Sequence, residues 1–102
     1  MAEVTVRRVA RWLRREFPVA PGAGRIRRVT FTNMDFAYTT PTGAIYLNKD
    51  YALGLQVEAL LHEWCHVRIG WKEEPHTQEF WKELGRVSKA YEAWIEEQGD
   101  DE

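Results

Sequence analysis

The histidines of this chain constrain its fold more than any other feature, because all three fall within fifteen positions, at residues 62, 66 and 76. His62 and His66 are four residues apart, and on a helix such positions lie about 40° apart around the axis and one turn along it. Their imidazole rings can therefore converge on one point. For His76 to reach the same point, the chain has to leave the helix and fold back, and Gly70 is well placed to end the helix.

Apolar residues at helical spacing support this interpretation on both sides of Gly70. Before it, from about residue 51, the apolar side of one helix consists of Leu53, Val57, Leu60, Leu61, Trp64 and Cys65. After it, Thr77 is a good N-cap for a helix that we expect to run to about Gln98. The buried stripe of that second helix consists of Phe80, Leu84, Val87, Tyr91 and Ile95.

The N-terminal half predicts a helix followed by short strands. Residues 4–17 carry apolar side chains at helical spacing, and two prolines and two glycines then break the chain at residues 18–24. Alternating or β-rich runs at residues 27–32, 36–40 and 44–48 predict three strands, with a turn at residues 40–43. We therefore expect an α+β fold with an N-terminal helix, a small, mainly antiparallel three-stranded sheet and two further helices.

Composition favours a single folded domain over residues 1–102. The hydrophobic share of 44% is that of a globule, and 102 residues suffice for one core. The apolar runs are too short to span a membrane, and we expect neither a secretory signal nor membrane contact. The single cysteine, Cys65, excludes an internal disulfide and fits a reducing compartment, so we expect a cytoplasmic protein. We also expect a monomer.

The sequence His62-Glu63-x-x-His66 combines two metal ligands with a candidate general base. Zinc binds imidazole nitrogens at about 2.0–2.1 Å in tetrahedral geometry, which requires converging rings. Glu63 directly follows the first histidine, so it lies next to the metal without ligating it and can move a proton from a water molecule to a leaving amine. The pattern predicts one Zn²⁺ ion and a hydrolytic reaction with Glu63 as the catalytic base. The alternative is a set of histidines packed in the core.

His76 is the best candidate for the third zinc ligand, both by ligand type and by position. The metzincin pattern would need a glycine and a histidine where this chain has Ile69 and Lys72. The thermolysin-like pattern uses a glutamate on a later helix, typically beside an asparagine, and no asparagine follows Asn48. Acidic residues therefore rank below His76, either as alternative ligands (Glu83 and Glu92) or as solvated charges (Glu73, Glu74 and Glu79).

The segment "IYLNKDY…QVEALLHEWCHVRIGWKEEPHTQEFWKEL" resembles the core of the SprT-like zinc metallopeptidases, over about residues 44–84. That family has a short strand, a helix with His-Glu-x-x-His, and a third histidine followed by a Gly-Pro-Glu-Phe-like start of a further helix. Here residues 76–80 read His-Thr-Gln-Glu-Phe, which keeps the His, Glu and Phe but not the Gly-Pro. The resemblance implies a minimal zincin-like domain with His62, His66 and His76 as ligands and Glu63 as base.

The same resemblance implies polypeptide substrates. The family includes proteases that cut proteins on DNA, often with additional nucleic-acid-binding modules, but this chain has no cysteine pairs for a zinc ribbon. The expectation is a metallopeptidase acting on DNA-associated or unfolded proteins. In size the chain is also similar to minimal single-domain gluzincin-like peptidases, whose third ligand is a glutamate. Two alternatives stay open: a zinc-stabilised module that binds nucleic acid or protein with little turnover, and a latent peptidase whose acidic tail occupies the cleft.

Charge is distributed unevenly along the chain. Residues 1–33 carry eight arginines against two acids, a net charge of +6, whereas the remainder carries six basic residues against fourteen acids, a net charge of −8. On the first predicted helix, one face opposite the apolar side holds Arg7, Arg8, Arg11, Arg14 and Arg15. This arginine face is either a DNA contact or a solvated surface, since basic clustering is the usual footprint of a nucleic-acid interface.

Three further residues could belong to a catalytic site. Cys65 is expected in the core, because it lies about 60° from His62 around the helix, on the side away from His66. Tyr38 and Tyr91 are candidates for stabilising an oxyanion, although Tyr91 also fits the apolar stripe of its helix. The strand region at residues 36–46 is where an extended peptide would add to the edge of the sheet.

Overall fold

The computed structural model describes residues 5–19, 28–33, 37–40, 44–70 and 76–99. Within these ranges the chain forms, in order, α1 (Val6–Glu16), β1 (Arg28–Thr32), β2 (Tyr38–Thr39), β3 (Ala44–Asn48), α2 (Leu53–Ile69) and α3 (Gln78–Gly99). The expected α+β class is confirmed, with an N-terminal helix, a three-stranded sheet and two further helices. The bounds of each helix lie within about two residues of those that hydrophobic spacing predicts.

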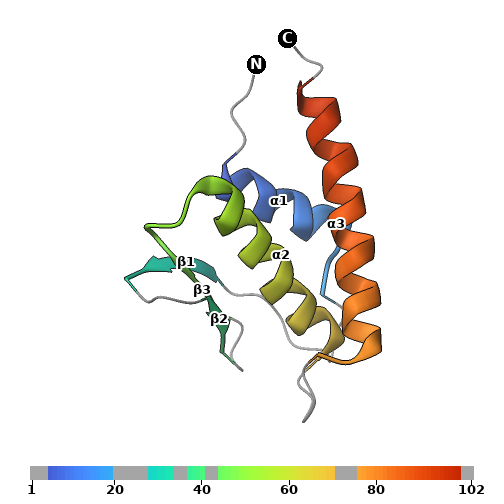
Figure 1. Ribbon diagram of the computed structural model, residues 1–102, viewed down its shortest axis with the longest axis horizontal. Coiled ribbons are helices and arrows are strands. Elements are labelled where there is room, and N and C mark those ends of the chain that lie inside the picture. Colours follow the sequence, from blue (N-terminus) through green and yellow to red (C-terminus); the bar gives the residue numbers. More distant parts are fainter. Residues whose placement is uncertain (1–4, 20–27, 34–36, 41–43, 71–75, 100–102) are drawn as a thin grey trace.

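Helix α2 lies at the centre of the molecule, between the sheet on one side and α3 on the other, with α1 crossing near the top of the view (Figure 1). It contacts α1, α3, β2 and β3. Because these neighbours cover it on several sides, its buried residues are not confined to one narrow stripe; they are Val57, Leu60, Leu61, Glu63, Trp64, Cys65 and Val67. Side chains on α2 are therefore held in place from both the sheet and α3.

The sheet is mixed, whereas the sequence predicted a mainly antiparallel one. Its strand order is β1-β3-β2, with β1 parallel and β2 antiparallel to β3. The prediction assumed that strands adjacent in sequence are adjacent in space. Instead β3, whose Ile45 and Leu47 are fully buried, takes the central position against α2. One strand of opposite direction separates β1 from β3 along the chain, so the two run the same way and pair in parallel.

The register of β2 against β3 decides which side chains face α2. Tyr38 pairs with Tyr46 and Thr39 pairs with Ile45, and successive side chains on a strand point to opposite faces. Ile45 belongs to the core beneath α2, so Thr39 also faces α2. Tyr38 and Tyr46 stack on the other face, with ring centroids 4.8 Å apart. The predicted turn at residues 40–43 lies largely outside the described residues.

Local interactions at the helix ends direct the chain into and out of α2. The side-chain amide of Gln56 donates a hydrogen bond to the carbonyl of Asn48 at 3.1 Å, which ties the start of α2 to the end of β3. At its other end α2 stops at Gly70, whose φ of 92° lies in the region that favours glycine and whose N–H donates to the carbonyl of His66. Thr77 caps α3 as predicted, because its Oγ1 accepts from the backbone N–H of Phe80 at 3.2 Å.

The core joins the three helices around large side chains. Trp64 of α2 is almost completely buried, and its indole Nε1–H donates to the carbonyl of Phe17 at 3.0 Å. Arg68 of α2 and Glu83 of α3 form an ion pair at 3.3 Å, and both of these side chains are largely buried. These interactions fix α2 relative to the end of α1 and to α3. None of the helices in the described part of the chain is long and apolar enough to cross a membrane.

Candidate metal centre

The structure brings the three predicted histidines together. His62 and His66 come from α2, and His76 lies two residues before α3. The Nε2 atom of His62 is 3.1 Å from Nε2 of His66 and 3.3 Å from Nε2 of His76. One ring nitrogen from each residue lies within 4.8 Å of the other two, so a single metal ion could contact all three. His76 is exposed while the other two rings are half-buried, so the cluster opens to solvent on the side of His76.

Phe80 packs against all three imidazoles. Its ring centroid is 5.0 Å from that of His62, 4.3 Å from that of His66 and 5.2 Å from that of His76. Phe80 is fully buried and donates its backbone N–H to the Thr77 cap. The turn that starts α3 therefore places His76 at the cluster and Phe80 beneath it. Hydrophobic spacing predicts Phe80 only as a core residue, and its contact with the histidines comes from the packing of α3 on α2.

Trp81 stacks on His76 from the solvent side. The two ring planes are 24° apart with centroids at 5.5 Å, and Trp81 also makes a T-shaped contact with His62, with centroids 6.3 Å apart. The side chain remains 53% exposed. Sequence reasoning assigned no role to Trp81. One feature of the sequence could have indicated it. Trp81 is a large aromatic residue that directly follows Phe80, so it cannot lie on the buried stripe of the same helix.

The environment of His62 and His66 favours neutral imidazoles. Burial, followed by the neighbouring rings of His62 and His76, lowers the pKa of His66 to about 4. Burial also lowers the pKa of His62; the adjacent Glu63 carboxylate partly offsets this effect, and His76 adds to it. Both rings are therefore unprotonated at neutral pH, which is the form that binds a metal ion.

Glu63 is buried beside the cluster and has a specific partner on the sheet. Its side chain is 8% exposed, and its Oε1 accepts a hydrogen bond of 2.6 Å from the hydroxyl of Thr39 on β2. Thr39 is itself buried and faces α2 because of its register against Ile45. Sequence reasoning missed Thr39, since nothing in the local pattern of a two-residue strand marks it as a partner for a residue 24 positions away.

A pocket of about 490 Å³ opens next to His62 and Glu63. It lies between the N-terminal part of α2 and the start of β2, and it is lined by Ala37, Tyr51, Leu55, Glu58, Ala59, His62 and Glu63. Its volume falls within the range of about 300–1,000 Å³ that is usual for ligand sites. The metal cluster and the candidate base therefore border a space that can admit another molecule.

The two tyrosines considered for oxyanion stabilisation lie elsewhere. Tyr38 points to the sheet face opposite α2, where it stacks on Tyr46. Tyr91 packs between α1 and α3, with ring centroids 6.0 Å from both Trp12 and Trp94, and burial raises its pKa. The structure therefore places neither side chain at the histidines.

The remaining candidate ligands also have other roles or positions. Cys65 is fully buried as expected, and burial raises the pKa of its thiol to about 12, which disfavours the thiolate that binds metals. Glu83 pairs with Arg68 and with Arg86 at 2.7 Å. Glu79 and Glu92 are exposed on α3, and Glu73 and Glu74 lie outside the described residues. The group that could hold a metal ion among the described residues contains the three histidines and no acid.

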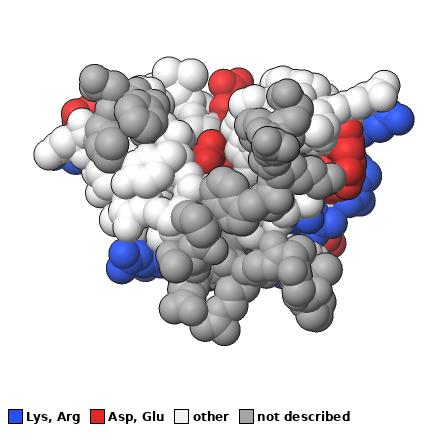
Figure 2. Space-filling view, turned by 90° about the horizontal axis from the view of Figure 1, so that it is seen from below, with Lys and Arg blue, Asp and Glu red and all other residues white. Residues whose placement is uncertain are grey.

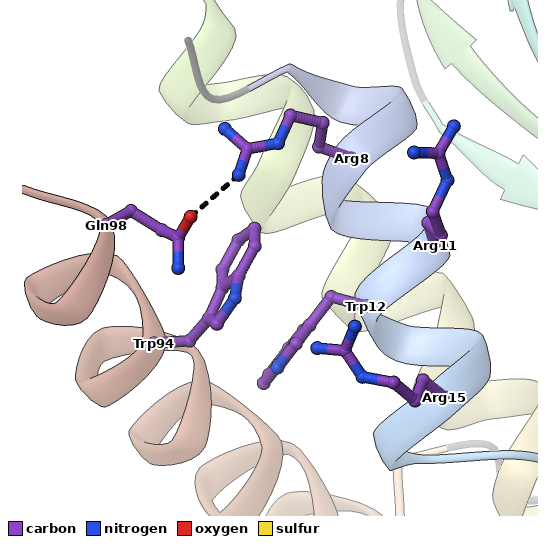
Figure 3. A pocket seen from close by; sticks show the side chains of 6 residues that line it. All are labelled: Arg8, Arg11, Trp12, Arg15, Trp94 and Gln98. Carbon is purple, nitrogen blue, oxygen red and sulfur yellow. Dashed lines mark hydrogen bonds between the residues drawn. The ribbon is translucent and has the colours of Figure 1, made fainter. Parts of the chain in front are cut away.

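The arginine face of α1 is partly engaged in contacts within the chain. Arg8 donates to Oε1 of Gln98 at 2.7 Å and lies over the ring of Trp94. Arg15 forms an exposed ion pair with Glu16 at 3.0 Å. Figure 3 shows the pocket of about 270 Å³ at this junction of α1 and α3, lined by Arg8, Arg11, Trp12, Arg15, Trp94 and Gln98. Arg11 points away from the two tryptophans, whereas Arg8 and Arg15 lie beside them (Figure 3).

Another side of the molecule carries charge of both signs. On the face shown in Figure 2, acidic groups lie at the top, near the middle and at the right, where basic groups adjoin them, and the basic groups gather mainly at the edges. No continuous basic surface is seen among the described atoms of that face.

The chain was compared with protein-family models, with curated proteins and with solved structures, and none of the three comparisons finds a match. What this site can do has therefore to be derived from its own geometry.

Proposed function

We propose that this protein is a zinc-dependent metallopeptidase in which His62, His66 and His76 hold the ion and Glu63 is the catalytic base. The observation that carries this proposal is the convergence of three imidazole nitrogens beside a buried glutamate. A structural zinc site normally closes with a fourth protein ligand and gains nothing from such a glutamate. A centre with three protein ligands instead leaves a position for water and substrate, as catalytic zinc sites do.

Zinc fits the donor atoms, and two of the three distances between them match its coordination geometry. Tetrahedral coordination at Zn–N distances of about 2.0–2.1 Å separates two ligand nitrogens by about 3.3 Å. The Nε2 atom of His62 lies 3.1 Å from that of His66 and 3.3 Å from that of His76, close to this value. Copper and nickel also accept imidazole, but three protein ligands next to a general base are the usual composition of a hydrolytic zinc site.

Glu63 is positioned to move the protons of hydrolysis. Bound zinc would supply a Lewis acid that polarises a peptide carbonyl and lowers the pKa of a water molecule. Glu63 would accept a proton from the attacking water and pass it to the nitrogen of the leaving amine. Because Thr39 donates to Oε1, the second carboxylate oxygen, Oε2, is the one that would carry the proton.

The resemblance of residues 44–84 to SprT-like metallopeptidases supports the same assignment. We infer from it that the chain is a minimal zincin-like domain of this kind, with unfolded or DNA-associated polypeptides as substrates. The arrangement of α2, with His62 and His66, followed by His76 just ahead of α3, is compatible with this inference. The family has Gly-Pro directly after the third histidine, whereas this chain has Thr77 and Gln78. Here Thr77 starts α3 by capping its N-terminus.

The decisive experiment is cleavage of a labelled unfolded protein by the zinc-loaded chain, beside Glu63→Gln. The variant keeps the shape of the side chain but removes the base, so we expect the rate to fall by about a hundredfold or more, with zinc retained. Glu92→Gln is the matched control, because it makes the same change at an exposed position of α3 and should leave the rate unchanged. Equal rates for Glu63→Gln and the wild-type chain would reject the proposal.

A DNA contact on α1 is a second proposal, carried by the exposure of Arg7, Arg11 and Arg14 on one helix. Binding of labelled single-stranded DNA should weaken as salt rises and as Arg7 and Arg11 are changed to glutamine. Lys89→Gln, at an exposed position on α3, is the control. DNA binding combined with no cleavage by the zinc-loaded chain would favour a zinc-stabilised binding module over a peptidase.

A further inference from the structure

Large apolar side chains are exposed next to the three imidazoles. Among the described residues, the exposed large hydrophobic side chains are Phe31, Leu53, Leu55 and Trp81, with exposed fractions of 44–54%. Leu55 lines the pocket that His62 also lines. Trp81 stacks on His76 and makes a T-shaped contact with His62. Half of this exposed apolar set therefore borders the candidate metal centre.

The geometry of α2 makes the apolar side chains continuous with the histidines. Leu55, Ala59 and His62 occupy positions i, i+4 and i+7, which lie within about 60° around the helix axis. All three line the same pocket, which Ala37 and Tyr51 complete from outside the helix. The one carboxylate in this wall besides Glu63 is that of Glu58, which is exposed. A molecule lying along α2 toward His62 would thus contact mainly apolar side chains.

We propose that this pocket binds an apolar side chain of an extended peptide and that Trp81, which stacks on His76, contacts the same peptide. We infer a peptide because the pocket and Trp81 both adjoin His62. A peptide that crosses the three imidazoles has to pass the pocket and Trp81. Removing apolar groups from water on both partners drives such binding. That this peptide is also cleaved rests on the proposed function.

The proposal names a substrate class. Folded proteins bury most of their large apolar side chains, whereas unfolded or flexible segments present them. A cleft that selects apolar side chains next to the metal centre would therefore act on exposed apolar segments and spare compact domains. A charged or purely polar segment would lack the contacts with Leu55 and Ala59.

Binding can be measured apart from catalysis. The probes are a short labelled peptide of glycine and serine with one central leucine, and the same peptide with serine or lysine in its place. Fluorescence anisotropy on zinc-loaded Glu63→Gln, which should not cleave, reports affinity. We expect the leucine peptide to bind about tenfold more tightly than the serine peptide, because burial of one leucine side chain contributes a difference of this size.

Three variants assign the contacts. In the Glu63→Gln background, Leu55→Ser should abolish most of the preference for leucine, and Phe31→Ser, which changes an equally exposed apolar residue on β1, should leave it unchanged. Because both side chains are about half exposed, thermal unfolding should confirm that both variants fold. Trp81→Ala should weaken binding of all three peptides while zinc content, measured in parallel, is retained.

The outcomes separate this inference from the peptidase proposal. Equal affinity for the leucine and serine peptides, tighter binding of the lysine peptide, or the same loss in Phe31→Ser as in Leu55→Ser would overturn the apolar pocket. A leucine preference that depends on Leu55, in a wild-type chain that cleaves nothing, would sustain the pocket and reject the peptidase. Cleavage that depends on Glu63 but shows no preference for leucine would sustain the peptidase proposal and reject the apolar pocket.

Discussion

At the scale of single residues, the pair Thr39 and Glu63 links the sheet to the candidate chemistry. Glu63 is buried, and a buried carboxylate needs a hydrogen-bond donor to be stable there. Thr39 supplies it at 2.6 Å. The bond also limits the orientations of the carboxylate and so directs Oε2. Thr39 is accordingly a positioning residue in the proposed reaction.

Replacing Thr39 by valine should therefore affect both stability and rate. Valine keeps the branched shape but cannot donate, so Glu63 loses its partner, and we expect the free energy of unfolding to fall by about 1–3 kcal/mol. Denaturant titration measures the loss, and kcat and KM on an unfolded protein report the catalytic effect, which we expect mainly in kcat. Thr39→Ser should restore both. A fully active Thr39→Val would show that the bond does not position Glu63.

The third ligand can be tested in the same way. His76→Ala removes one of three imidazoles, and we expect zinc affinity to drop by more than the roughly 10–100-fold that loss of an outer-shell partner causes. Competition with a chelator measures the affinity. Glu83→Gln is the control, since Glu83 was the alternative ligand and is paired with Arg68 instead. Retained affinity in His76→Ala together with loss in Glu83→Gln would reverse the assignment.

At the scale of elements, the end of α2 determines whether His76 can return to the cluster. Gly70 adopts a φ of 92°, and a β-carbon added to it would meet no atom within 4 Å. The need for glycine is thus conformational and not steric. The residues between Gly70 and His76 lie outside the described ranges. The structure therefore describes how α2 ends at Gly70 and where the chain resumes at His76.

Gly70→Ala should destabilise the protein by about 1 kcal/mol and lower its zinc affinity. The penalty arises because alanine disfavours positive φ, and a relaxed helix end would move His76. Gly85→Ala is the matched control: Gly85 lies within α3, with space for a β-carbon and without a positive φ, so the change should stabilise by roughly 0.5–1 kcal/mol. Thermal unfolding and chelator competition measure both variants. An equal response of the two would contradict the role of Gly70.

The elements were predicted unequally well. Helical periodicity and end residues such as Thr77 and Gly70 gave the three helices within about two residues, because these signals are local. The prediction of a mainly antiparallel sheet was wrong, because the direction of pairing depends on which strand packs against α2. The deep burial of Ile45 and Leu47 puts β3 in the centre of the sheet. The order of the strands along the chain does not reveal this position.

At the scale of the whole molecule, the central position of α2 explains why one helix can carry the candidate site. The sheet supplies Thr39 on one side of α2, and α3 supplies Phe80 and Trp81 on the other. α1 contributes its buried face to the core, and just past its end the carbonyl of Phe17 accepts from Trp64. The basic helix α1 also meets α3 through Arg8 and Gln98, so part of the uneven charge is used in packing (Figure 3).

The sequence by itself determined the helices, the fold class and the placing of His62, Glu63 and His66 on one helix, because spacing along a helix already fixes relative direction. Only the tertiary structure decided the rest. Thr39 reaches Glu63 through strand register, Phe80 and Trp81 reach the imidazoles through the packing of α3, and Leu55 borders the pocket because β2 begins opposite it. These contacts join residues that are distant in the chain, and their positions follow from how whole elements pack and not from any local pattern.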